Sequence, residues 1–190
     1  GRSADSINRK IADRIKTGFG LTDEEYARMT PQQATDSLLA RKNRDPQTAR
    51  LPYDLRFHGE IRQCGKVTSL RCTVYTLTGG AHGLLTNLFF NFDTESGKPL
   101  DKADLFSDTA GLQRLNRQYF AKHLSDAALS EDALFVGTDQ LPLPENVGID
   151  SSGVTMLYNL YEVAPYAIGT IEYRIPYEQA EPLLRRIARR

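Results

Sequence analysis

The residue best suited by its type and spacing to do chemistry is His82, which lies among three glycines in the segment TGGAHG. A histidine can act as a base, a proton switch or a metal ligand, but each role requires partner residues. The sequence has no HExxH motif, no GxSxG motif and no second histidine at ligand spacing. Because glycines allow positive φ angles and close backbone approach, Gly79, Gly80 and Gly83 favour a tight structural corner. The functional alternative is that His82 acts as a base, a proton switch or a single metal ligand.

The acidic segment NFDTESGKPLDKADLF is a second candidate for chemistry. Its alternating carboxylates resemble a calcium loop, but an EF-hand needs a glycine at its sixth position, where counting from Asp93 gives Lys98. The segment therefore predicts a turn, and we predict no metal and no cofactor. A hydrolase centred on His82 with Asp93 or Asp104 is kept as an alternative hypothesis, because acid–base partners must meet within hydrogen-bond reach in the fold.

A third candidate is the tyrosine-rich segment YNLYEVAPYAIGTIEYRIPY, residues 158–177, which contains five of the nine tyrosines. Tyrosine combines an apolar ring with a polar tip, which suits a surface that grips sugar rings or another protein. Core packing would explain Tyr173 equally well, because half-buried tyrosines are common in sheets. From this segment we predict four binding residues: Tyr158, Tyr161, Glu162 and Tyr166.

The elements that position these residues follow from the period of the apolar residues. Apolar residues at helical spacing predict helices over residues 5–19, from Thr30-Pro31 onward, over 109–124 and at the C-terminus. A period of two predicts strands over residues 55–62, 67–78, 84–92, 146–150, 154–158 and 169–175. Because this order lacks regular β–α alternation, we predict an α+β fold: antiparallel sheets of hairpins with two long helices and a C-terminal helix.

The first predicted strand alternates Leu55, Phe57 and Ile61 with charged and polar residues. This alternation predicts that the three apolar side chains face a core while the other face of the strand is solvated. We expect His58, on that second face, to be exposed.

The two cysteines, Cys64 and Cys72, are too few for a zinc site. If Gly65-Lys66 forms a two-residue hairpin, the two thiols lie on opposite faces and too far apart for a disulfide. A wide loop over residues 65–71 would instead let them meet. The hairpin geometry favours free thiols.

Composition limits the partners. The 190 residues are 40% hydrophobic, which is enough for one compact domain or two small ones. The 24 basic residues balance 24 acidic ones, so no uniform field attracts nucleic acid, and we predict no nucleic-acid partner. No apolar run approaches the length of about 20 residues that a spanning helix requires.

Three runs, TGGAHG, then FFNFDTESGKPL with DLF, then YNLYEVAPYAIGTIEYRIPY, resemble in sequence and order a domain-of-unknown-function family. That family forms the C-terminal half of the lysozyme-sensing anti-sigma factor of Gram-positive bacteria and the non-catalytic module of peptidoglycan deacetylase C. The resemblance covers roughly residues 50–190, and residues 1–50 look like the smaller companion domain without its usual first strand. We therefore predict two domains, a smaller N-terminal companion over residues 1–78 and a C-terminal domain over residues 79–190.

The resemblance implies an extracytoplasmic protein, at the periplasm or cell surface, often held at the membrane periphery as a lipoprotein by an anchor upstream of residue 1. It implies a non-catalytic binding module whose partner is a cell-wall glycan or a lysozyme-like protein. It assigns no catalytic role to His82 or the glycines around it, but it supports a structural corner that also borders a binding surface. We therefore predict Gly79, Gly80, His82 and Gly83 as further binding residues. The sequence lacks the sigma-binding and membrane-spanning segments of an anti-sigma factor, so lysozyme sensing itself is not implied. A purely structural envelope protein is a further alternative.

Overall fold

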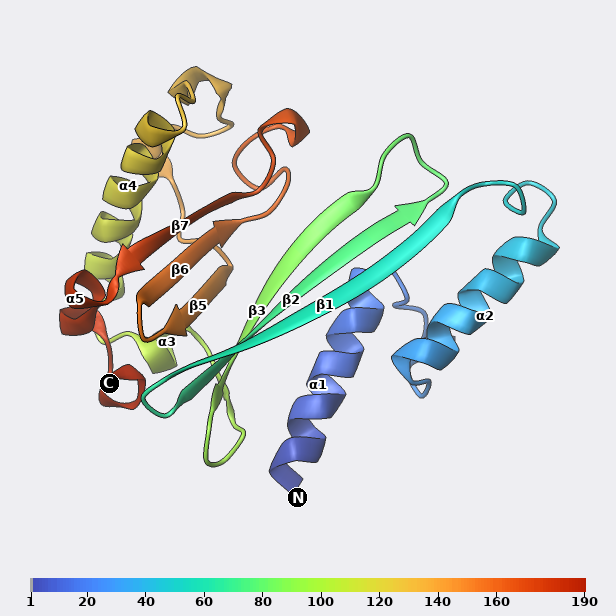
Figure 1. Ribbon diagram of the computed structural model, residues 1–190, viewed down its shortest axis with the longest axis horizontal. Coiled ribbons are helices and arrows are strands. Elements are labelled where there is room, and N and C mark those ends of the chain that lie inside the picture. Colours follow the sequence, from blue (N-terminus) through green and yellow to red (C-terminus); the bar gives the residue numbers. More distant parts are fainter. Residues whose placement is uncertain (1) are drawn as a thin grey trace. The chain divides into compact units, whose positions relative to one another are not determined.

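The computed structural model describes the backbone of residues 2–190 and the side chains from residue 5 onward, except those of residues 6, 14 and 18. Five helices alternate with two groups of strands, as Figure 1 shows. The helices are α1 (Arg2–Gly18), α2 (Pro31–Arg44), α3 (Lys102–Leu105), α4 (Thr109–Asp126) and α5 (Tyr177–Ala180). The strands are β1 (Tyr53–Cys64), β2 (Val67–Thr78), β3 (Leu84–Asp93), β4 (Pro99–Leu100), β5 (Asn146–Asp150), β6 (Gly153–Tyr158) and β7 (Ile171–Pro176).

The strands form two sheets, one in the order β1-β2-β3-β4 and one in the order β5-β6-β7. Strand pairs β3–β4, β5–β6 and β6–β7 are antiparallel, and β1 is joined to β2 through the two-residue turn at Gly65-Lys66. Gly65 has a φ of 57°, a conformation that suits glycine in such a turn. The predicted α+β class with antiparallel sheets of hairpins is therefore confirmed.

By its internal contacts the chain divides into two compact units. The first unit comprises residues 1–58 and 73–86, and the second comprises residues 59–72 and 87–190. The strands β1, β2 and β3 each contribute residues to both units, so no single break in the chain separates them. The domain boundary after residue 78 stays a prediction.

The first unit contains α1 and α2 around a small core of Leu21, Tyr26 and Ala34. Helix α2 begins as expected, because Thr30 caps it in a capping box with Gln33 and proline occupies its first turn. No helix in the described part of the chain is long and apolar enough to cross a bilayer.

The second unit has the larger core, built on the sheet β5-β6-β7. Every residue of β5 and β6 is buried, and α4 packs along β7 (Figure 1). The expected C-terminal helix would contain Leu183, Leu184 and Ile187, but the chain ends in α5, a single turn that precedes these residues, followed by two short 3-10 segments. Of those residues, Leu184 is buried and packs into this core.

Strand β1 departs from its predicted burial. The side chain of Ile61 is 71% exposed and that of Phe57 is 41% exposed, although the period-two pattern predicted that both would face a core. The physical reason is that no layer covers this part of β1, the edge strand of its sheet, because most of its residues from position 56 to 63 are exposed on both faces. Alternation tells which residues share a face, but it does not tell whether another layer covers that face.

Both cysteines are free and buried, which confirms the prediction of free thiols. The Cys64 thiol donates to the carbonyl of Ala188 at 3.2 Å. Burial raises the pKa of the Cys64 thiol, and it raises the pKa of Cys72 to about 11.

We therefore expect both thiols to resist labelling in the native protein. At about pH 8, a thiol pKa of about 11 lowers the thiolate fraction of Cys72 by roughly a hundredfold relative to an ordinary cysteine, and burial slows access further. A disulfide-exchange reagent such as DTNB checks this by the number of thiols released per chain, which should be near zero in buffer and two in denaturant. Rapid labelling of the folded protein would contradict the buried placement.

Candidate functional site

The predicted binding residues separate into a buried group and an exposed group. Tyr158, in β6, is fully buried, and its ring lies edge-on to that of Phe120 with 5.7 Å between ring centroids. Its hydroxyl donates to the carbonyl of Pro142 at 2.5 Å. Tyr158 is therefore a core residue rather than a surface contact, because the sheet β5-β6-β7 is covered on the side that its ring faces.

Asn116 of α4 connects the buried tyrosines. Its Nδ2 donates to the Tyr158 hydroxyl at 2.8 Å, and its Oδ1 accepts from the Tyr173 hydroxyl at 2.6 Å. Asn116 is fully buried, so these bonds satisfy polar groups that have no access to water. Burial raises the pKa of Tyr158 to about 12 and raises the pKa of Tyr173 well above its usual range.

These tyrosines should make the protein sensitive to alkali. Because the folded-state pKa of Tyr158 exceeds the ordinary value of about 10, its contribution to stability is complete below pH 10 and is lost as the pH rises to about 12. A shift of this size corresponds to about 3 kcal/mol. Denaturant titrations at increasing pH should show this loss for the native sequence and a smaller one for Tyr158→Phe. A stability that stays constant across this window in the native sequence would contradict the burial of the hydroxyl.

The exposed group lies in the loop between β6 and β7. Tyr161 is 52% exposed and Tyr166 is 36% exposed, and their ring centroids are 5.8 Å apart with an interplanar angle of 36°. Tyr161 has a φ of 68°, which is uncommon for a residue with a side chain and costs about 1–3 kcal/mol. The surrounding loop must hold Tyr161 in this conformation.

Several contacts fix that loop. The side-chain amide of Asn159 makes two hydrogen bonds to the backbone of β3. Its Oδ1 accepts from the N–H of Asn87 at 2.6 Å, and its Nδ2 donates to the carbonyl of Asn87 at 2.8 Å, as the backbone of a neighbouring strand would. Val163 and Ala164 of the same loop are buried in the core of the second unit. Contacts within the protein therefore hold the loop in its conformation without a ligand.

A third exposed aromatic residue, Phe135, joins this region. Phe135 is 57% exposed, and its backbone N–H donates to the carbonyl of Val163 at 2.9 Å. It lies in an irregular stretch without apolar periodicity, so sequence reasoning missed it; its only signal was an aromatic residue among turn-forming residues. We call Phe135, Tyr161 and Tyr166, together with Glu162, the aromatic surface.

Glu162 adds a carboxylate to the aromatic surface. The residue reaches solvent, but protein atoms crowd its carboxyl group, and this partial burial raises its pKa. The Asn159 side chain, with Nδ2 3.4 Å from Oε1, offsets part of that rise. The aromatic surface thus offers two hydroxyls, three rings and one hydrogen-bond-accepting carboxylate.

The GGAHG corner belongs to the first unit. His82 is exposed, and its Nδ1 lies 3.2 Å from the carbonyl oxygen of Gly83. A Cβ at Gly83 would come within 2.3 Å of the Tyr75 ring, and a Cβ at Gly79, whose φ is 85°, would come within 2.7 Å of the Leu51 side chain. Gly80 has no comparable crowding. Close packing of two of the glycines accounts for the corner.

The two carboxylates of the hydrolase hypothesis have local structural roles. Asp93 accepts from the backbone N–H groups of Glu95 and Ser96, and the Ser96 bonds hold the pKa of Asp93 below its usual range. Asp104 completes the capping box of α3 with Asp101. The described residues contain no group of three or more histidine, cysteine or acidic side chains that could hold a metal ion.

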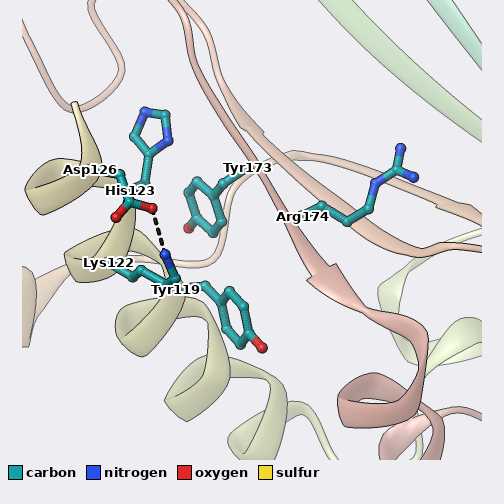
Figure 2. A pocket seen from close by; sticks show the side chains of 6 residues that line it. All are labelled: Tyr119, Lys122, His123, Asp126, Tyr173 and Arg174. Carbon is teal, nitrogen blue, oxygen red and sulfur yellow. Dashed lines mark hydrogen bonds and ion pairs between the residues drawn. The ribbon is translucent and has the colours of Figure 1, made fainter.

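A hollow of about 220 Å³ lies between α4 and β7. Figure 2 shows the six residues that line it: Tyr119, Lys122, His123, Asp126, Tyr173 and Arg174. Its charged groups are already paired: Lys122 lies 2.5 Å from Asp126, and Arg174 lies 3.1 Å from the carboxylate of Asp150. The His123 ring lies 5.8 Å from that of Tyr173, whose hydroxyl is bound to Asn116. The hollow is a partly open junction between a helix and a strand, and we assign no chemistry to it.

Comparison with known proteins bears on the second unit. Residues 103–178 match the family described as Protein of unknown function (DUF3298). This match confirms, for those residues, the expected resemblance to a domain-of-unknown-function family. The DUF3298 segment contains α4, β5, β6, β7 and all four residues of the aromatic surface.

Two crystal structures of DUF3298 family members resemble most of the chain. One, from Bacteroides fragilis, has a TM-score of 0.63 and 22% sequence identity, over 96% of this chain and 80% of that chain. The other, from Pseudomonas aeruginosa PAO1, has a TM-score of 0.60 and 20% identity, over 83% of this chain and 71% of that chain. At these identities the likeness shows the fold alone. No curated protein matches the sequence. The DUF3298 description assigns no activity, so function must be argued from the aromatic surface.

Proposed function

We propose that this chain is a non-catalytic, extracytoplasmic binding module of the bacterial cell envelope that binds peptidoglycan fragments or a lysozyme-like protein through the aromatic surface. The observation that carries the proposal is the exposure of Phe135, Tyr161 and Tyr166 on two loops joined by a backbone hydrogen bond. The family resemblance supports the envelope setting, and it supports attachment through a lipid anchor upstream of residue 1.

The chemistry of the aromatic surface suits a glycan or a protein ligand. Tyrosine offers a large, rigid contact area at low cost in conformational entropy, and its hydroxyl can bond to a polar partner. Glu162 can accept hydrogen bonds from sugar hydroxyls or from amide groups. Because the loop is already fixed by Asn159 and by buried Val163, binding need not order it, and less affinity is lost.

The local roles of the reactive side chains support a non-catalytic module. Nδ1 of His82 contacts the neighbouring backbone carbonyl, while Asp93 and Asp104 accept hydrogen bonds in a turn and a helix cap. A general base must reach the proton that it abstracts. None of the three contacts orients the imidazole against an acidic partner, so the hydrolase hypothesis gains no support from them.

A sedimentation assay with purified peptidoglycan sacculi tests the proposal. We expect the native sequence to co-sediment, and the double variant Tyr161→Ala/Tyr166→Ala to lose affinity by about tenfold or more, as for central aromatic contacts. Ile61→Ala is the matched control, because Ile61 is exposed in the same unit but lies outside the aromatic surface. An equal loss of affinity in the control would show that the assay reports nonspecific adsorption.

A titration with lysozyme distinguishes the two proposed partners. Binding to lysozyme without binding to sacculi would select the protein partner, and the reverse would select the glycan. In either case the tyrosine double variant should bind more weakly. If both assays are blank for the native sequence, the binding proposal fails and a purely structural role is left.

A further inference from the structure

A second hollow, in the first unit, has a lining unlike that of the aromatic surface. Its volume is about 410 Å³, within the range of small-molecule pockets. It is lined by residues of β1, β2 and β3: Arg56, Phe57, His58, Thr73, Tyr75 and Leu85. All six belong to the first unit, and Phe57 and Leu85 expose apolar surface to it.

Tyr75 is one of the residues that line this hollow, and its ring packs against the glycine corner. The Tyr75 ring lies directly against the backbone of Gly83, where a Cβ would approach the ring to 2.3 Å. The φ of Gly83 lies outside the left-handed region, so the requirement for glycine at this position comes from space rather than from backbone conformation. Gly83 of the GGAHG motif thus leaves the space that the Tyr75 ring occupies.

Arg56 supplies the positive charge. Its guanidinium lies over the Tyr75 ring, with Cζ 5.4 Å from the ring centroid. Asp54 accepts hydrogen bonds from Nε and Nη2 of Arg56. A guanidinium carries five N–H donors, so this pairing does not exhaust it. Because the Arg56 side chain is largely exposed, its pair with Asp54 is weak enough for a ligand to compete with it.

We propose that this hollow binds a small carboxylate carried on a six-membered ring. The guanidinium of Arg56 would hold the carboxylate, the hydroxyl of Tyr75 would bond to a polar substituent, and Phe57 and Leu85 would contact the ring. The six lining residues include no acidic side chain, but the Asp54 carboxylate is bonded to Arg56, so an incoming carboxylate must displace it or share the guanidinium with it. This site is independent of the aromatic surface.

The test is a titration of the full chain, labelled with ¹⁵N, monitored by amide chemical shifts. The probes are glucuronate and benzoate, which distinguish a sugar acid from an aromatic acid, and neutral glucose. We expect saturable shifts at residues 56–58, 73–75 and 85 with one of the two carboxylates, at a Kd on the order of 1 mM, and none with glucose.

Two variants check the assignment. Arg56→Gln should weaken binding at least about tenfold, a loss expected for a charge-assisted contact. Gly83→Ala should weaken it by displacing Tyr75. Arg41→Gln, which removes an exposed cation of the same unit outside the hollow, should leave binding unchanged. The proposal is overturned if neither carboxylate produces saturable shifts at the lining residues, if glucose binds equally well, or if Arg56→Gln binds as tightly as the native sequence.

Discussion

Replacing Gly153 with alanine is expected to destabilise the second unit by more than about 3 kcal/mol. Gly153 begins β6 with a φ of 146°, and a Cβ there would lie 2.1 Å from the carbonyl oxygen of Ile175. That oxygen belongs to the backbone of β7, which pairs with β6 along its length, so it cannot move without breaking the central sheet. Denaturant unfolding followed by circular dichroism measures the loss.

Gly169→Ala is the matched control for this prediction. Gly169 also has a positive φ, 83°, but a Cβ there would meet no atom within 4 Å. Its φ of 83° and ψ of −164° are readily adopted only by glycine, so its replacement should cost the backbone strain alone, about 1–3 kcal/mol. If the two alanine variants unfold at the same denaturant concentration, the close approach of β6 and β7 at Gly153 is not as described.

Replacing Asn116 with alanine is expected to cost about 3–4 kcal/mol. The substitution removes the partner of two buried tyrosine hydroxyls and leaves a small cavity in α4 against the sheet. Tyr158 keeps its bond to the carbonyl of Pro142 at 2.5 Å, whereas the Tyr173 hydroxyl keeps only its longer bond, 3.3 Å, to the backbone carbonyl of residue 116.

Gln118→Ala provides the comparison, because Gln118 is exposed on the same helix two residues away. It should change the free energy of unfolding by no more than about 0.5 kcal/mol. Thermal or denaturant unfolding of both variants checks the pair. An Asn116→Ala protein as stable as Gln118→Ala would show that the buried hydroxyls find other partners.

The sequence predicted the elements of this fold better than it predicted their burial. Helical spacing identified α1 and α4, and the period of two identified most strands, because these patterns reflect backbone geometry directly. The exposure of Ile61 could not be foreseen, since strand alternation does not reveal which strand is outermost.

The tyrosine segment shows the same limit at the candidate site. Tyr158 and Tyr161 are three residues apart and have the same side chain, yet one ends a buried strand and the other begins an exposed loop. What separates them is the covering by α4, through Asn116, and the positive φ at Tyr161. Neither feature follows from residue type or local spacing, because both depend on tertiary contacts. Phe135 reaches the aromatic surface through one backbone hydrogen bond to Val163, a contact between distant parts of the chain.

The central claim is that the aromatic surface is the place where this protein meets its partner. The most direct measurement is a titration of the ¹⁵N-labelled native chain with soluble peptidoglycan fragments and, separately, with lysozyme, followed residue by residue. We predict that at least one of them causes saturable changes centred on residue 135 and residues 159–169. Saturable binding whose changes centre elsewhere, or no binding of either partner, would contradict the claim.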